Sequence, residues 1–76
     1  MPKPSADWIA RLPQDRLLCE YSMWSADLIR LAGDLDRIAP HADMLHIDVA
    51  DGHFAPALLF FPDLVARMRD ATSVPI

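Results

Sequence analysis

The stretch that decides the fold runs from Met44 to Pro56 and reads MLHIDVADGHFAP. Its first six residues alternate with a period of two, which is typical of a β-strand and places every second side chain on one face. The aliphatic face consists of Leu45, Ile47 and Val49. His46 and Asp48 share the opposite face, near the carboxyl end of the strand. Burying a carboxylate alone is very costly, so this face is expected to provide a partner for Asp48.

Helices and strands are expected to alternate on both sides of this strand. Ser5 and Ser25 are typical helix N-caps, and Pro13 and Pro40 end the apolar patterns that follow them. In chain order, the expected elements are a helix over residues 5–12, a strand over 16–23, a helix over 25–40, a strand over 44–49, a helix over 62–72 and the start of a third strand over 73–76. Residues 50–60 read as a loop. Strands alternating with helices form βαβ units, so the predicted fold class is α/β with a parallel sheet.

Length and composition indicate one small domain over residues 1–76 that benefits from a larger core. A chain of 76 residues supports one domain, and it buries only about 60% of its unfolded surface. Hydrophobic residues make up 53% of it, which exceeds the roughly 45–50% of an average globular domain. We therefore expect this domain to be part of a larger folded unit.

The charge pattern and the missing signals restrict partners and compartment. The formal net charge is −4 and no cluster of Lys and Arg occurs, so neither a nucleic acid nor an anionic membrane is an expected partner. No apolar run approaches the ~20 residues of a membrane span, and the first residues do not resemble a secretory signal. Cys19 is the only cysteine, which fits a reducing compartment. We expect a cytoplasmic protein.

Two linked motifs give the chain a family resemblance. SMWSAD at Ser22–Asp27 and HIDVADGHFAP at His46–Pro56 together resemble ribulose-phosphate 3-epimerase and its relatives that epimerise ketohexose 6-phosphates. The order and spacing of the motifs agree with the family pattern, and VPI at 74–76 stands where that family begins its third strand. The resemblance covers nearly all of the chain after about Leu17.

The resemblance implies a fold, a metal and a reaction. The family is a (β/α)₈ TIM barrel, which needs about 250 residues, so the chain would be the N-terminal portion of one ribulose-phosphate-binding barrel. A divalent cation (Zn, Mn, Fe or Co) would be bound by His46 and Asp48. Asp48 would also be one of two acid/base carboxylates in 3-epimerisation of a ketose phosphate through an enediolate. Ser22 would hydrogen-bond the sugar-phosphate substrate.

The chain departs from the family pattern in some of its pocket residues, and it lacks several parts of the family's active site. The departures are Tyr21, Trp24, Ala50 and Ala57, and they leave the identity of the sugar open. The family's second histidine ligand, second carboxylate and phosphate-binding loop have no counterpart in these 76 residues. We therefore expect the chain alone to be inactive, and to form homo-oligomers that cover its open strand edges and apolar faces.

Other interpretations of the same residues stay open. His46 and Asp48 can be an ordinary structural pair, which is the more frequent meaning of His-x-Asp on a strand. A lyase or decarboxylase on the same barrel would favour a lysine near the acids, and no lysine follows Lys3. The chain can also be a partial barrel that acts only by self-association. His53 is expected to shape the loop, to contact the substrate or simply to face solvent.

Overall fold

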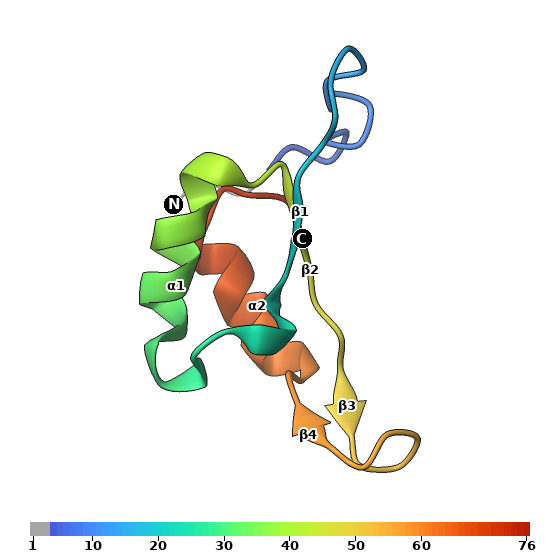
Figure 1. Ribbon diagram of the computed structural model, residues 1–76, viewed down its shortest axis with the longest axis vertical. Helices are drawn as coiled ribbons and strands as arrows, with labels where there is room; N and C mark the ends of the chain where they lie inside the picture. The colour runs from blue at the N-terminus through green and yellow to red at the C-terminus, as the bar shows by residue number, and fades with distance from the viewer. Residues whose placement is uncertain (1–3) are drawn as a thin grey trace.

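The computed structural model describes residues 4–76. Its strands and helices are β1 (Glu20–Ser22), α1 (Leu31–Ile38), β2 (Met44–His46), β3 (Ala50–Asp51), β4 (Leu58–Leu59) and α2 (Pro62–Ala71). Short 3₁₀ helices occupy Met23–Ser25, Leu28–Arg30 and Ala39–His41. Figure 1 shows α1 and α2 on one side of the β1–β2 pair, with the β3–β4 hairpin extending from one end and the N-terminal segment from the other.

The β1–β2 pair is parallel, as the sequence predicts. Tyr21 pairs with Leu45 and Ser22 with His46, and a helical segment connects the two strands. The backbone N–H of Leu45 donates a hydrogen bond of 2.8 Å to the Pro75 carbonyl, so the end of the chain runs beside β2. No strand is assigned over the expected 73–76, but this contact lies where the third strand was predicted. Parallel pairing with helices confirms the α/β class, and the barrel itself stays a prediction.

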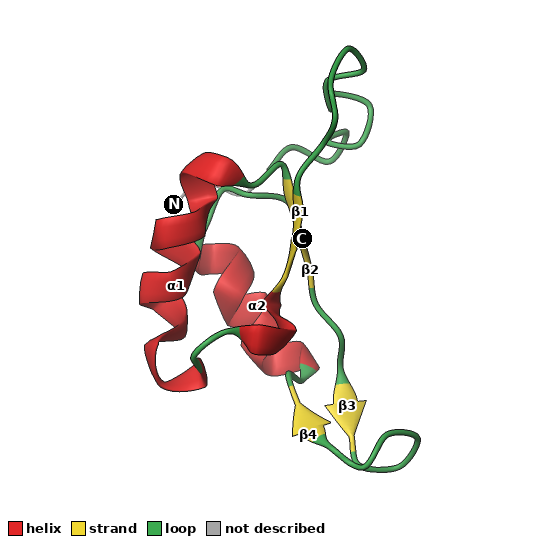
Figure 2. Cartoon of the chain, in the orientation of Figure 1, coloured by secondary structure: helices red, strands yellow, loops and turns green. Residues whose placement is uncertain are grey.

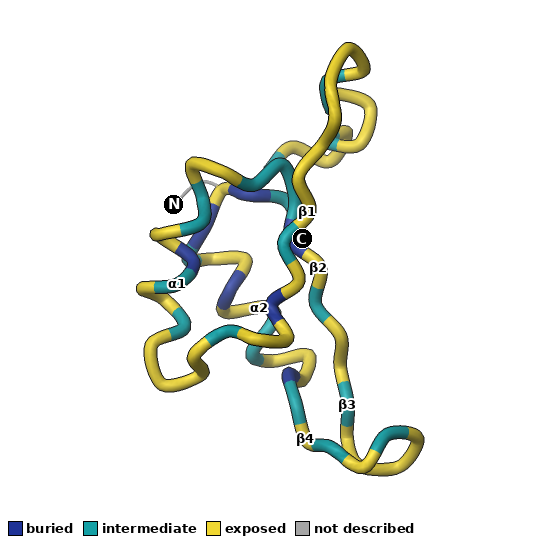
Figure 3. The backbone as a smooth tube through the Cα atoms, in the orientation of Figure 1, coloured by how far each residue is buried: buried dark blue, intermediate teal, exposed yellow. Residues whose placement is uncertain are grey.

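A small apolar core lies between the two helices and the β1–β2 pair (Figure 3). Its buried members are Met23, Leu35, Leu45, Phe60, Met68 and Val74. Burial of one such side chain stabilises a fold by about 1.5–3 kcal/mol. The buried Thr72 hydroxyl accepts a hydrogen bond from the Val74 backbone N–H at 3.2 Å, which satisfies a polar group inside the core. This core holds the two strands in place against α1 and α2.

The predicted helix over residues 5–12 is wrong. The segment forms successive turns instead of a helix (Figure 2). Its backbone hydrogen bonds join residues three positions apart, from Trp8 N–H to Ser5 O and from Leu12 N–H to Ile9 O. Ile9 is 68% exposed, so this apolar side chain gains little from packing. Isolated helices of this length are marginal without such packing, which explains why capping and periodicity were insufficient.

The predicted strand over 16–23 is shortened to β1, and the residues before it are held by an ion pair. Arg16 binds both carboxylate oxygens of Asp43, at 2.6 and 3.0 Å, and the Cys19 N–H donates to Asp43 at 2.7 Å. The Arg16 hydrogen bond, followed by the Cys19 N–H, lowers the pKa of Asp43 to about 2. This contact attaches the N-terminal segment to the start of β2.

The predicted helix over 25–40 forms in three pieces. Ser25 ends a 3₁₀ turn instead of capping the helix, and Asp27 is the cap, its carboxylate accepting from Ile29 N at 3.0 Å. The regular α-helix begins only at Leu31, and Pro40 lies within the final 3₁₀ turn. By contrast, α2 begins at Pro62 as predicted, because proline is favoured at the first helical position.

The predicted loop over 50–60 contains a short antiparallel hairpin. Ala50 pairs with Leu59 and Asp51 with Leu58. Gly52 follows β3 with φ of +87°, a conformation that residues with a side chain rarely adopt. Neither helix within the described part of the chain has the length and hydrophobicity needed to cross a bilayer.

Candidate functional site

The candidate site is the face of the β1–β2 pair that points away from the helices. Ser22 and His46 are register partners in the parallel pair, so their side chains lie on the same face. Both residues end their strands, and the carboxyl end of a parallel sheet is where α/β proteins bind ligands. The backbone pairing therefore brings the two sequence motifs together, although 24 positions separate them in the chain.

His46 and Asp48 are brought together as the alternating pattern predicts. The His46 Nε2 atom lies 3.0 Å from Asp48 Oδ1, and about half of each side chain is exposed. Leu45 is buried in the core and Ile47 packs against it. Val49 departs from the pattern, since it is 55% exposed. Regular pairing ends at His46, so nothing holds Val49 to the aliphatic face.

A third polar residue, Glu20, completes a cluster that sequence reasoning missed. Its Oε1 atom lies 3.1 Å from His46 Nδ1, so the imidazole lies between two carboxylates. The hydrogen bond to Asp48, followed by the one to Glu20, raises the pKa of His46. The signal available in the sequence was the alternation of side chains along a strand: Glu20 is two residues before Ser22, and therefore on the same face of β1. Its contact with His46 follows only once the strands are paired.

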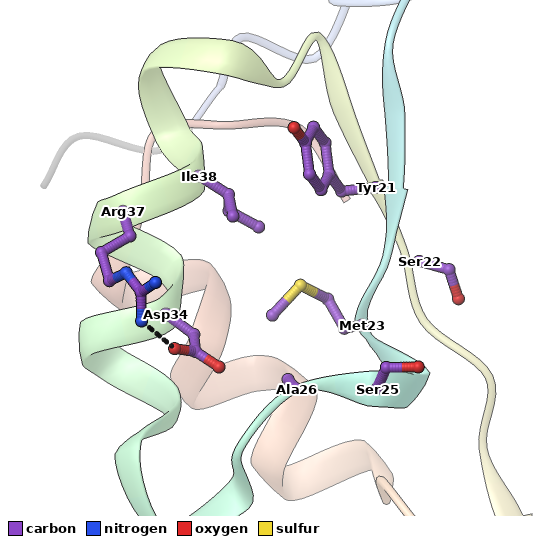
Figure 4. Close-up of a pocket in the computed structure, with 8 residues that line it drawn as sticks. All are labelled: Tyr21, Ser22, Met23, Ser25, Ala26, Asp34, Arg37 and Ile38. Atoms are coloured by element: carbon purple, nitrogen blue, oxygen red, sulfur yellow. Dashed lines mark hydrogen bonds and ion pairs between the residues drawn. The ribbon is translucent and has the colours of Figure 1, made fainter.

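Ser22 lies at the edge between this polar face and a pocket on the helix side. The pocket has a volume of about 360 Å³ and lies between the end of β1 and α1. In Figure 4 the side chains of Tyr21 and Met23 point towards α1, while the Ser22 hydroxyl points away from them. Ser22 is exposed, and its position next to His46 allows its hydroxyl to reach a molecule bound on the polar face.

The remaining histidines do not join the cluster. His53 pairs with Asp51 after β3, with Nδ1 and Oδ1 3.1 Å apart and both side chains largely exposed. His41 ends the 3₁₀ turn before β2 and is exposed. The His53 side chain is thus both part of the turn after β3 and open to solvent.

The donors on the polar face suit part of a divalent-metal site. An imidazole nitrogen and a carboxylate oxygen are ligands that Zn, Mn, Fe and Co accept. Among residues 4–76, however, no group of three or more His, Cys, Asp or Glu side chains is arranged to hold a metal ion. Glu20 contacts Nδ1 of the His46 ring and Asp48 contacts Nε2. Of the three side chains, only His46 and Asp48 therefore direct possible ligand atoms at the same point.

Comparisons with known proteins agree with the two motifs. The chain is 36% identical over 55 residues to a ribulose-phosphate 3-epimerase of Helicobacter pylori strain J99, which covers 72% of this chain and 25% of the relative. It is 45% identical over 49 residues to the Rhodobacter capsulatus ribulose-phosphate 3-epimerase, covering 63% of this chain and 22% of the relative. A third relative, from Oryza sativa subsp. japonica, is named as the cytoplasmic isoform and is 40% identical over 52 residues, with 67% and 23% covered.

The matches cover most of this chain but only a part of each relative. No solved structure gives a significant match. The chain spans about a quarter of the length of the curated relatives it matches. The model of the ribulose-phosphate 3 epimerase family matches residues 18–76, which include both motifs and every member of the polar cluster. Because this match covers most of the chain, the chain belongs to the ribulose-phosphate 3-epimerase family.

Proposed function

We propose that the chain contributes part of the active site of a metal-dependent 3-epimerase, which interconverts ketose phosphates of the D-ribulose 5-phosphate and D-xylulose 5-phosphate type. The observation that supports this most strongly is the convergence of His46 Nε2 and Asp48 Oδ1, 3.0 Å apart, beside Ser22 at the ends of two parallel strands. A purely structural pair would not require an exposed hydroxyl in register with the imidazole.

The proposed roles follow from the chemistry of each group. Epimerisation removes the proton from the carbon next to a ketone and returns it to the opposite face, through an enediolate. Asp48 acts on one face, because an exposed carboxylate can accept a proton from that carbon and give it back. Ser22 donates a hydrogen bond to the sugar phosphate and orients it. The carboxylate for the other face and the phosphate-binding loop are assigned to protein outside residues 1–76.

His46 and Asp48 are the residues that would hold the cation. When bound, a divalent cation would supply a Lewis acid that favours negative charge on the substrate's carbonyl oxygen. The His46 Nε2 atom would bind a metal only in its deprotonated form, so a bound cation would take the place of the hydrogen bond to Asp48. Two protein donors predict weak affinity for the 76 residues alone, since a complete site has four or more ligands.

Exposed apolar side chains and sheet edges bear on how the chain assembles. Leu17, Ile29 and Phe54 are each more than 90% exposed, and within residues 4–76 β1 and β2 form a two-stranded sheet. Such apolar surface and open edges favour association, so we propose a homo-oligomer. A self-associating protein without catalytic activity is the second candidate, and the same exposed residues support it. A cytoplasmic location stays a prediction.

A chimera tests whether these residues support the reaction. Residues 18–76 would replace the matching segment of the Helicobacter pylori relative, and conversion of ribulose 5-phosphate would be measured with deuterium uptake from heavy water. We expect conversion and uptake to disappear after chelation and to return with added Zn²⁺ or Mn²⁺. A folded chimera that binds metal but incorporates no deuterium would contradict the epimerase and favour the non-catalytic candidate.

A further inference from the structure

Glu20 is the member of the polar cluster to which the proposed function gives no role. It lies on β1, and its carboxylate is 3.1 Å from His46 Nδ1. The opposite ring nitrogen, Nε2, faces Asp48 at 3.0 Å. The ring is therefore held from both sides, with one nitrogen directed at a neighbouring strand and the other at the second proposed ligand. This arrangement fixes the ring's orientation as well as its position.

The two carboxylates cannot have the same role once a cation is bound. A histidine that binds a metal through one nitrogen carries its proton on the other nitrogen. If the cation binds between His46 and Asp48, it takes Nε2, and the remaining proton is on Nδ1. The Glu20 carboxylate is already within hydrogen-bond distance of that nitrogen. Glu20 itself points at the wrong side of the ring to join Asp48 as a ligand.

We propose that Glu20 is a positioning residue, which accepts the Nδ1–H hydrogen bond of His46 and thereby keeps Nε2 directed towards the metal. This inference rests on the proposed metal-binding role of His46. A hydrogen-bond acceptor in this place selects the ring tautomer, restrains rotation about the side chain, and makes the ligating nitrogen a better donor. All three effects act through His46, so Glu20 needs no contact with the cation.

Substitution of Glu20 separates its hydrogen bond from its charge. Glu20→Ala removes both, whereas Glu20→Gln keeps an acceptor oxygen on a side chain of the same length. Asp36→Ala is the matched control, because it removes one exposed carboxylate from α1, outside the cluster. Circular dichroism establishes that each variant is folded; Glu20 is half exposed, so its loss should leave the core unchanged.

The measurement is a titration of the purified, nitrogen-15-labelled protein with Zn²⁺ alone, followed through the imidazole signals of His46. We expect zinc at Nε2 and a proton on Nδ1 in the wild type. Glu20→Ala should weaken Zn²⁺ binding about tenfold or more, while Glu20→Gln should stay within about threefold of the wild type. Asp36→Ala should match the wild type.

The outcomes distinguish this inference from the function on which it rests. If Zn²⁺ binds Nε2 with the same affinity in Glu20→Ala, the positioning role is wrong and the metal site stands. If Glu20→Gln is as weak as Glu20→Ala, the charge of Glu20 matters and its hydrogen bond does not, which also overturns the role. If Zn²⁺ does not perturb His46 in the wild type, both the metal site and the inference fail.

Discussion

The two faces of the β1–β2 pair are built from alternate residues of the two strands and of the residues directly after them, yet they differ in burial and polarity. Met23 and Leu45 on the helix side are buried in the core. Ser22, His46 and Asp48 on the other side are exposed and polar. The contrast teaches that packing on one face allows polar groups to converge on the other, so substitutions on the two faces should have separable effects.

The largest expected effect is on the polar face. Asp48→Asn keeps the size of the side chain but removes the proposed base, so in the chimera the rate of deuterium uptake should fall by about 100- to 10,000-fold. The free energy of unfolding should change little, because Asp48 is half exposed. Asp51→Asn, which removes a carboxylate from the hairpin, is the control. Uptake at the normal rate in Asp48→Asn would remove Asp48 from the mechanism.

On the helix face, the expected effect is on stability. Leu45 is 4% exposed, and Leu45→Ala should lower the free energy of unfolding by about 2–5 kcal/mol through lost burial and a residual cavity. Denaturant titration of the chain measures this change. Leu17→Ala is the matched control, since Leu17 is 94% exposed and should alter stability by less than about 0.5 kcal/mol. Equal losses in both variants would contradict the assignment of Leu45 to the core.

A smaller effect is expected where the N-terminal segment meets β2. Asp43 has its pKa lowered from 3.8 to about 2 when folded, so its ionised form stabilises the fold above about pH 4. That contribution should be lost as the pH falls from about 4 to 2. Asp43→Asn should lower stability at neutral pH and flatten this part of the pH profile, measured by denaturant titration at several pH values.

Removing the partner of Asp43 provides the check on this pH dependence. Arg16→Gln should reproduce most of the effect, because the Arg16 hydrogen bond is the first cause of the lowered pKa. The double variant should add little to either single change, since both break the same contact. A wild-type profile that is flat from pH 4 to 2 would contradict the assigned role of the ion pair.

The smallest expected effect is in the hairpin that follows the polar face. Gly52 has φ of +87°, so Gly52→Ala should lower the free energy of unfolding by about 1 kcal/mol. Gly33→Ala is the opposite case, because Gly33 lies in α1 with nothing within 4 Å of an added Cβ. That change should raise stability by about 0.5–1 kcal/mol. Thermal unfolding of the two variants should therefore shift in opposite directions.

Features governed by local rules were predictable from the sequence. The start of α2 follows from Pro62 and an acid in the first turn, and both depend only on neighbouring residues. The shared side of His46 and Asp48 follows from alternation with a period of two. The parallel β1–β2 pair follows from the order of helices and strands.

Features that depend on tertiary contacts were not predictable in the same way. The helix expected over 5–12 has suitable residues, but Ile9 is largely exposed and gains little from packing. The contact of Glu20 with His46 requires the register of two strands that are distant in sequence. The hairpin depends on pairing between residues on either side of a turn, Ala50 with Leu59 and Asp51 with Leu58.

The central claim is that the polar face of the β1–β2 pair binds a divalent cation through His46 and Asp48. Titration of the protein with Mn²⁺, read as paramagnetic broadening of its amide signals, tests this most directly because broadening decreases steeply with distance from the ion. We predict that broadening is centred on His46 and Asp48, with Ser22 next affected and α2 unaffected. Broadening centred instead on the Asp51–His53 hairpin pair, or none around His46, would contradict the claim.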